Sequence, residues 1–124
     1  MRVLNLEGFP LRQRDLLHTW GQISALYIPL QAMMDNPYDV VHMSRTDLLT
    51  LVQWCERLIR IKGSNPSAHS YRLKSLFERS PGGFYITNGQ MKGAMILAEF
   101  EPANLSRKNW IFNVSAKSLR DLSN

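Results

Sequence analysis

The most constraining feature of this sequence is a segment around residue 95 that is apolar on almost every side. Between Gln90 and Glu99 the only other long polar side chain is Lys92, and the remaining residues are Met, Gly, Ala, Ile and Leu. Thr87 and Gln90 have the spacing of a capping box, which begins a helix. The pattern predicts a helix that ends at about Glu99. Because this helix lacks a broad polar face, we expect it at the centre of the core, with Lys92 turned to water.

The size and composition of the chain indicate one domain. The 124 residues are 44% apolar and 20% charged, which is enough for a single core over residues 1–124. No stretch approaches the roughly 20 apolar residues of a membrane span, and residues 1–10 lack the apolar core of a secretion signal. We therefore expect a cytoplasmic protein with no membrane partner.

Apolar periodicity predicts three further helices. They cover residues 10–35, with a bend at Pro29, residues 44–62, and residues 66–79. Ser44 precedes an acidic side chain by three residues, which is typical of a helix start. Gly63 suits the left-handed position that ends a helix.

Two short strands complete the predicted fold. Residues 84–86 are Phe-Tyr-Ile, and residues 110–114 alternate in the manner of a half-buried strand. The sequence thus predicts a mainly α, α+β protein, built as a compact bundle of about four helices with a minor two-stranded sheet.

The segment 44–79 has the outline of a helix-turn-helix, with a four-residue link at Gly63. In this motif the later helix enters the DNA groove. Arg72, Ser75 and Arg79 would share one stripe of that helix, with Tyr71 and Lys74 beside them. These side chains supply donors for phosphates and for base edges.

The charge distribution favours the same interpretation. The net charge is +5, and residues 63–124 carry eight Lys and Arg against four Asp and Glu. An excess of this kind attracts polyanions. We expect Lys74, Arg107 and Lys108 to hold phosphates, so that DNA or RNA is the favoured partner.

An acidic protein is the alternative partner for this basic face. Tyr71, Tyr85 and Trp110 would then be aromatic anchors of the binding energy. For Trp110 a place in the core is the better interpretation, because it alternates with Phe112 and Val114. This alternative predicts a protein-binding inhibitor of a host defence or replication system.

The sequence contains no pattern typical of an enzyme. His18, His42 and His69 belong to three separate predicted segments and have no metal-ligand spacing with one another. Cys55, the only cysteine, falls on an apolar helix face and is expected in the core. We therefore expect no catalytic residue, no metal and no cofactor.

The residues from about 69 to 114 resemble small uncharacterised accessory proteins of prophages and plasmids. The resemblance is carried by Ser70-Tyr71-Arg72-Leu73-Lys74, Glu78, Gly83-Phe84-Tyr85-Ile86-Thr87-Asn88-Gly89, Lys92 and Ala94-Met95. No activity is established for that group. The resemblance implies a mobile-element context, in which regulators and inhibitors of host systems are common.

Overall fold

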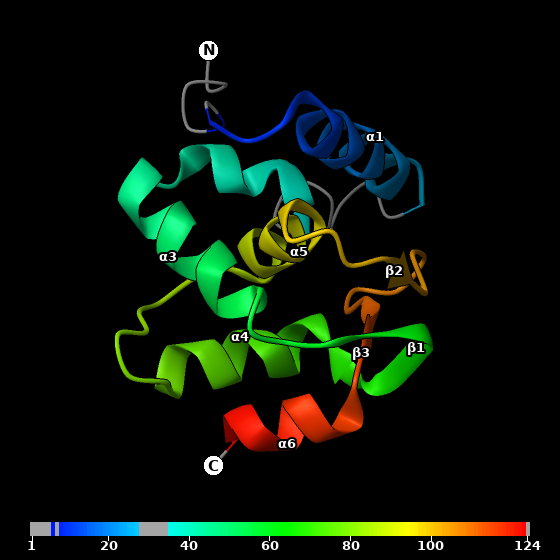
Figure 1. Cartoon of the computed structure of the whole chain (residues 1–124). Helices are drawn as coiled ribbons and strands as arrows, with labels where there is room; N and C mark the ends of the chain where they lie inside the picture. The colour runs from blue at the N-terminus through cyan, green and yellow to red at the C-terminus, as the bar shows by residue number, and fades with distance from the viewer. Residues whose placement is uncertain (1–5, 7, 28–34, 124) are drawn as a thin grey trace.

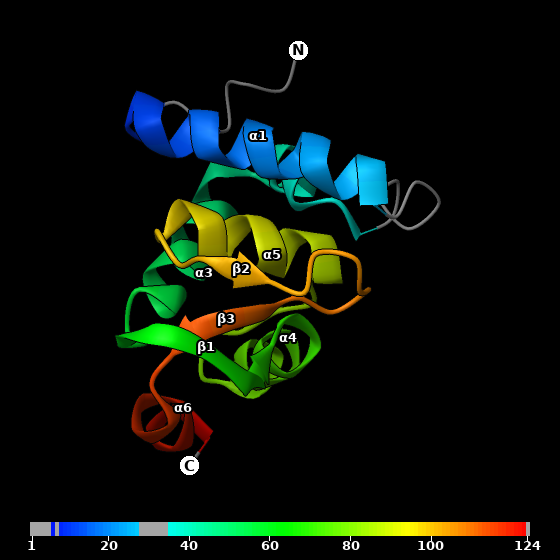
Figure 2. The same ribbon diagram turned by 90° about the vertical axis from the view of Figure 1, so that its right-hand side faces the viewer.

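The computed structural model describes residue 6, residues 8–27 and residues 35–123. Within these ranges it contains five α-helices, one 3₁₀ helix and a three-stranded antiparallel sheet. The α+β class is therefore confirmed. The bundle of about four helices and the sheet of two strands are not. In both views α1 and α6 lie at opposite ends of the molecule, with α5 and the sheet between them (Figures 1 and 2).

The apolar helix is confirmed as α5, Asn88–Leu97, and it is buried along almost its whole length. Its capping box is present: the Thr87 side chain accepts a hydrogen bond from the Gln90 backbone N–H at 3.0 Å. In return, Gln90 Oε1 accepts from the Thr87 N–H at 2.9 Å. Glu99 has a positive φ of 70° just beyond the helix, which turns the chain out of it.

Helix α5 is the hub of the fold because it contacts α1, α3, α4 and the 3₁₀ helix η2, Pro37–His42. The contact with η2 depends on two glycines of α5. A Cβ atom on Gly93 would lie 2.1 Å from the Pro37 carbonyl oxygen, and one on Gly89 would lie 2.6 Å from the Asn36 carbonyl oxygen. Only glycine permits two backbones to approach this closely.

The first two predicted helices are present in part. Helix α1 is Leu11–Tyr27, and the predicted bend at Pro29 lies outside the described residues. Helix α3 is Arg45–Cys55, with Ser44 Oγ accepting from the Asp47 N–H at 3.1 Å as predicted. It ends at Cys55, well before Gly63.

The segment between α3 and α4 is a strand, which corrects the predicted helix-turn-helix. Residues Arg60–His69 form β1, an edge strand, and the next helix is α4, Ser70–Arg79. A ten-residue strand thus takes the place of the predicted four-residue link and of the first turn of the predicted helix 66–79. In segment 44–79 the two helices are therefore joined through a strand of the sheet and not by a short turn.

The partner of the predicted strand 110–114 is also different from the expectation. Residues Ile111–Val114 form β3, the central strand, which pairs with β1 on one side and with β2, Pro102–Ala103, on the other. Residues 84–86 are not a strand. Residues 84–86 are apolar, whereas β1, the strand that pairs with β3 instead, is mostly polar and exposed.

The core surrounds α5 and is rich in aromatic side chains. Trp110 packs against Trp20, and Phe77 packs against both Trp54 and Phe84, all in edge-to-face arrangements. Trp110 is fully buried, as expected. Cys55 is buried and free, and burial raises the pKa of its thiol, so its role as a small core residue is confirmed. Among the described helices, none has the length and apolar character required to cross a bilayer.

Candidate functional site: a basic lobe

Helix α4 presents both predicted arginines outward. The Arg72 Nη1 atom donates to the Ser67 carbonyl at 3.4 Å, and Arg79 Nε donates to the Ser75 carbonyl at 3.3 Å. Among the described residues neither guanidinium forms an ion pair with a carboxylate. Both charges therefore remain available to an external anion.

Lys74 is not the free phosphate ligand that the sequence predicts. Its side chain is only 14% exposed, and Nζ lies 3.1 Å from Glu78 Oε2 one turn later. The same nitrogen lies 5.4 Å from the ring centroid of Tyr71 and 5.2 Å from that of Tyr85. Lys74 is thus held in place by one carboxylate and two aromatic rings. Its charge interacts mainly with these groups of the protein itself.

The start of α4 meets the loop that carries Arg107 and Lys108. The Ser70 N–H donates to the Trp110 carbonyl at 2.8 Å, and the Trp110 N–H donates to Ser70 Oγ at 3.2 Å. This pair of bonds fixes the first residue of α4 against the end of the loop.

The start of α5 meets the same loop. Asn88 Nδ2 donates to the Lys108 carbonyl at 3.2 Å and to Asn109 Oδ1 at 3.0 Å. Two helix N-termini therefore converge on one basic loop. Each N-terminus carries a partial positive charge, so their fields add to those of Arg107 and Lys108.

An open hollow of about 420 Å³ lies beside the first turn of α4, and we call it the basic hollow. It contains no acidic side chain, and its lining residues are Pro66, His69, Asn104, Arg107, Lys108, Asn109 and Ile111. Sequence patterns identified Arg107, Lys108 and His69, which lies near the start of the predicted binding helix. They did not identify the other members, which reach the hollow from the strand and the loop.

His69 is the N-cap of α4 as well as a member of the hollow. Its Nδ1 atom accepts a hydrogen bond from the Arg72 N–H at 3.2 Å. An imidazole nitrogen that accepts carries no proton, so in this geometry the ring proton is on Nε2. The ring lines the hollow beside the two cations.

The charge is concentrated in one part of the fold, the strands together with α4 and α6, Ala116–Ser123. We call residues 60–79 and 102–123 the basic lobe. It contains nine Lys and Arg against two Asp and Glu, whereas the whole chain has fifteen against ten. Both acids are already paired within helices, Glu78 with Lys74 and Asp121 with Lys117. The excess positive charge of the lobe is therefore not neutralised internally.

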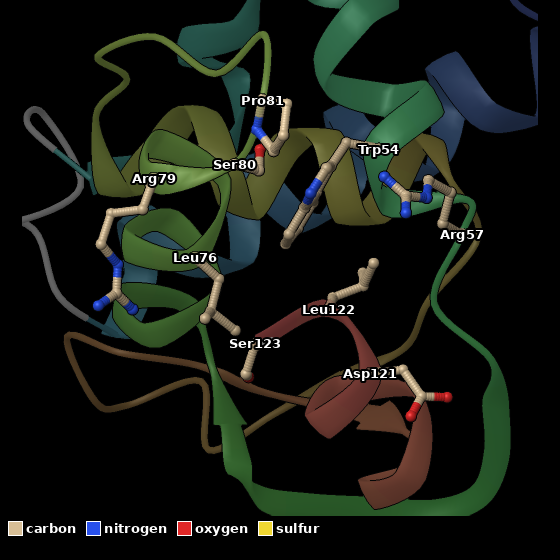
Figure 3. Close-up of a pocket in the computed structure, with 9 residues that line it drawn as sticks. All are labelled: Trp54, Arg57, Leu76, Arg79, Ser80, Pro81, Asp121, Leu122 and Ser123. Carbon is tan, nitrogen blue, oxygen red and sulfur yellow. The ribbon is translucent and has the colours of Figure 1, made fainter.

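Arg79 lies apart from the basic hollow, at the other end of α4. It lines a second pocket of about 440 Å³ together with Arg57, and Figure 3 shows the two guanidinium groups on either side of Trp54 and Leu122. The remaining lining residues are Leu76, Ser80, Pro81, Asp121 and Ser123. The structure therefore divides the predicted site residues. Arg107 and Lys108 line the basic hollow, Tyr71 and Arg72 lie on the first turn of α4 next to its N-cap His69, and Arg79 lines the second pocket.

A buried lysine in the centre of the fold was missed by the sequence patterns. Lys92 was expected to face water but is 1% exposed, and its Nζ lies 4.6 Å from the Trp110 ring centroid. Burial lowers the pKa of Lys92 to about 8, although Asp35 and Asp39 act to raise it. Burial raises the pKa of Asp39 to about 6, and the nearby Asp35 adds to this effect.

Within the described ranges no group of three or more His, Cys, Asp or Glu side chains is placed to hold a metal ion. Comparison of the chain with protein-family models, with curated proteins and with solved structures gives no match. The basic lobe is therefore the basis on which a function can be assigned.

Proposed function

We propose that this chain is a non-enzymatic, nucleic-acid-binding accessory protein that contacts the phosphate backbone through its basic lobe. The observation that carries the proposal is the excess of nine cations over two acids, both acids being paired, in residues 60–79 and 102–123. A nucleic acid is the partner with a matching density of negative charge.

The arrangement of the basic hollow supports phosphate as the group that is bound. Arg107 and Lys108 lie beside the N-termini of α4 and α5, and the His69 ring lines the hollow beside the two cations. Cations, helix N-termini and neutral donors are the three kinds of group that proteins use for phosphate oxygens. Such contacts position the nucleic acid and do not read its sequence, so we expect weak sequence preference.

The proposal is tested by the salt dependence of binding. We expect fluorescence anisotropy with a labelled oligonucleotide to give an affinity that falls steeply as salt rises. Replacing Arg107→Gln and Lys108→Gln should weaken binding and reduce the slope of log K against log salt by about 1 for each lost phosphate contact.

A variant with the same net charge provides the control. Gln22→Glu with Gln53→Glu also lowers the charge by two, on exposed positions of α1 and α3 outside the basic lobe. We expect it to bind nearly as the unchanged protein does. Equal losses in the two double variants would mean that only net charge matters, and the assignment of the site would be wrong.

A second candidate is an inhibitor that docks an acidic protein, and one observation favours it. The edge strand β1 begins next to Ile59, which is 62% exposed, and contains Ile61, which is 41% exposed. Exposed apolar side chains on a free strand edge suit the addition of a partner strand. The test is a pull-down with this chain from a nuclease-treated lysate. Recovery of one stoichiometric protein would favour this candidate if the chain also binds no oligonucleotide.

A further inference from the structure

We infer that the nucleic acid bound by this protein is single-stranded, and that unpaired bases stack on Tyr71 and Tyr85. The inference rests on the proposed function and names the class of nucleic acid. It is carried by the two exposed tyrosines and by the lysine between them.

The two tyrosine rings are unusually exposed for aromatic side chains. Tyr71 is 55% exposed and Tyr85 is 77% exposed, although the two residues come from different segments, the first turn of α4 and the loop before α5. Exposed aromatic area of this size has no role in the core. It is free to contact a flat partner.

Lys74 holds both rings in position. Its Nζ lies 5.4 Å from one ring centroid and 5.2 Å from the other, and the ion pair with Glu78 fixes the lysine itself. Glu78 is anchored in turn, because its Oε2 accepts a hydrogen bond from the Ile86 N–H at 3.0 Å. The lysine nitrogen lies over each ring, and the two tyrosine residues still remain 55% and 77% exposed. The rings are thus ordered before a ligand binds, which lowers the entropic cost of stacking.

The tyrosines belong to the same two segments that contact the phosphate-binding loop, the start of α4 and the residues before α5. Tyr71 is two residues from His69 of the basic hollow, and Tyr85 is three residues from Asn88, which bonds the backbone of Lys108. A bound strand can therefore place phosphates at Arg107 and Lys108 and its bases on the rings. A basic groove beside aromatic platforms is the usual construction of single-strand binding sites.

A duplex does not use this arrangement. Its bases are already stacked and paired, so a tyrosine can stack on an internal base only after the duplex is locally opened, which costs free energy. Unpaired bases offer their faces without that cost. Stacking needs no particular base, which agrees with a site whose polar groups face phosphates.

The experiment compares three labelled probes of about 12 nucleotides: oligothymidine, an abasic strand with the same phosphates, and a duplex. We expect oligothymidine to bind most tightly. Tyr85→Ala should weaken oligothymidine binding by roughly 5-fold or more and leave binding of the abasic strand unchanged, because only a base can stack. Tyr85→Phe keeps the ring and should bind as the unchanged protein does. Tyr71→Ala and Tyr71→Phe form a second matched pair.

The outcomes separate this inference from the proposed function. If all three probes bind equally and the alanine variants change nothing, the stacking inference is wrong and the phosphate-binding function stands. If no probe binds even at low salt, the proposed function itself is wrong. An alanine variant that loses affinity for the abasic strand to the same extent would show a general loss of the site and would also overturn stacking.

Discussion

The ammonium nitrogen of Lys92 lies 4.6 Å from the centroid of the Trp110 ring, and both side chains are buried at the junction of α5 and the sheet. This relationship links the core to the negative charges of Asp35 and Asp39, which face Lys92 from the segment before α3. A buried cation with partly buried acids nearby makes folding depend on pH.

The first prediction concerns that pH dependence. Because the folded-state pKa of Asp39 is about 6 instead of 3.8, the folded protein binds more protons than the unfolded chain between these values, and stability falls as pH rises through that window. Because the folded-state pKa of Lys92 is about 8 instead of 10.5, the folded protein binds fewer protons there, and stability rises from pH 8 to pH 10.5. The free energy of unfolding, measured with urea at several pH values, should therefore have a minimum between about pH 6 and 8 that comes from these two groups.

Two substitutions assign the limbs of this profile. Asp39→Asn should flatten the acid limb, and Lys92→Met should flatten the alkaline limb. Asp15→Asn, on an exposed position of α1, serves as the control and should preserve both. A profile that keeps its minimum in both variants would contradict the assignment.

The second prediction concerns the close approach of α5 and η2. Gly93→Ala should lower the free energy of unfolding by about 1–3 kcal/mol, because its Cβ would lie 2.1 Å from the Pro37 carbonyl oxygen and 2.5 Å from Val40 Cγ1. Gly63→Ala is the matched control, since nothing lies within 4 Å of a Cβ added there. Thermal and urea unfolding should separate the two variants, and equal stabilities would mean that the packing of η2 adjusts freely.

The third prediction concerns the start of the central helix. Thr87→Ala removes the acceptor of the Gln90 N–H and should cost about 1 kcal/mol of stability. Thr50→Ala, in the interior of α3, loses only a bond to the Thr46 carbonyl that the helix does not need. It should change stability by less than about 0.5 kcal/mol. The comparison is made by urea unfolding, and a Thr87 variant as stable as the Thr50 variant would show that the cap contributes little.

The fourth prediction separates the two arginines of α4. Arg72→Gln should weaken oligonucleotide binding and reduce the salt slope by about 1, because Arg72 lies on the first turn of α4, beside the basic hollow. Arg79→Gln makes the same change in charge on the same helix but at the second pocket, and it should have a smaller effect. Anisotropy titrations at several salt concentrations give both quantities. A larger loss for Arg79 would move the binding site to the pocket of Arg57 and Arg79.

Short-range signals account for what the sequence predicted well. The caps at Ser44 and Thr87 involve partners three residues away, so their geometry can be recognised from spacing alone. The apolar helix needed only its own composition. In each case the physics that decides the structure lies within a few residues.

Long-range pairing accounts for what was missed. Strand β1 contains Gly63 and Pro66, which are typical of turns, and it is mostly exposed, so it shows no alternation. Its conformation is decided by pairing with β3, and Asn65 Nδ2 even donates to the carbonyl of Val114, 49 residues later. Lys92 was misplaced for the same reason, because the acids that permit its burial come from a distant segment. Local propensity cannot carry such information.

The site was partly predictable from charge. Arg107 and Lys108 are exposed cations, and their type alone indicated phosphate contacts. Two features of the site could not be predicted: Arg79 lies apart from the other cations, and Lys74 pairs with groups of the protein. Both depend on how the helices pack together, which the sequence does not specify directly.

The order of strands in the sheet has a consequence for the newly synthesised chain. The central strand β3, Ile111–Val114, is the last of the three to leave the ribosome, so β1 has no strand partner until residues 111–114 have emerged. During translation Ile59 and Ile61 therefore flank an unpaired backbone edge that nascent chains on neighbouring ribosomes can join. Slow translation of the segment between β1 and β3 therefore prolongs the time during which this edge is open to aggregation.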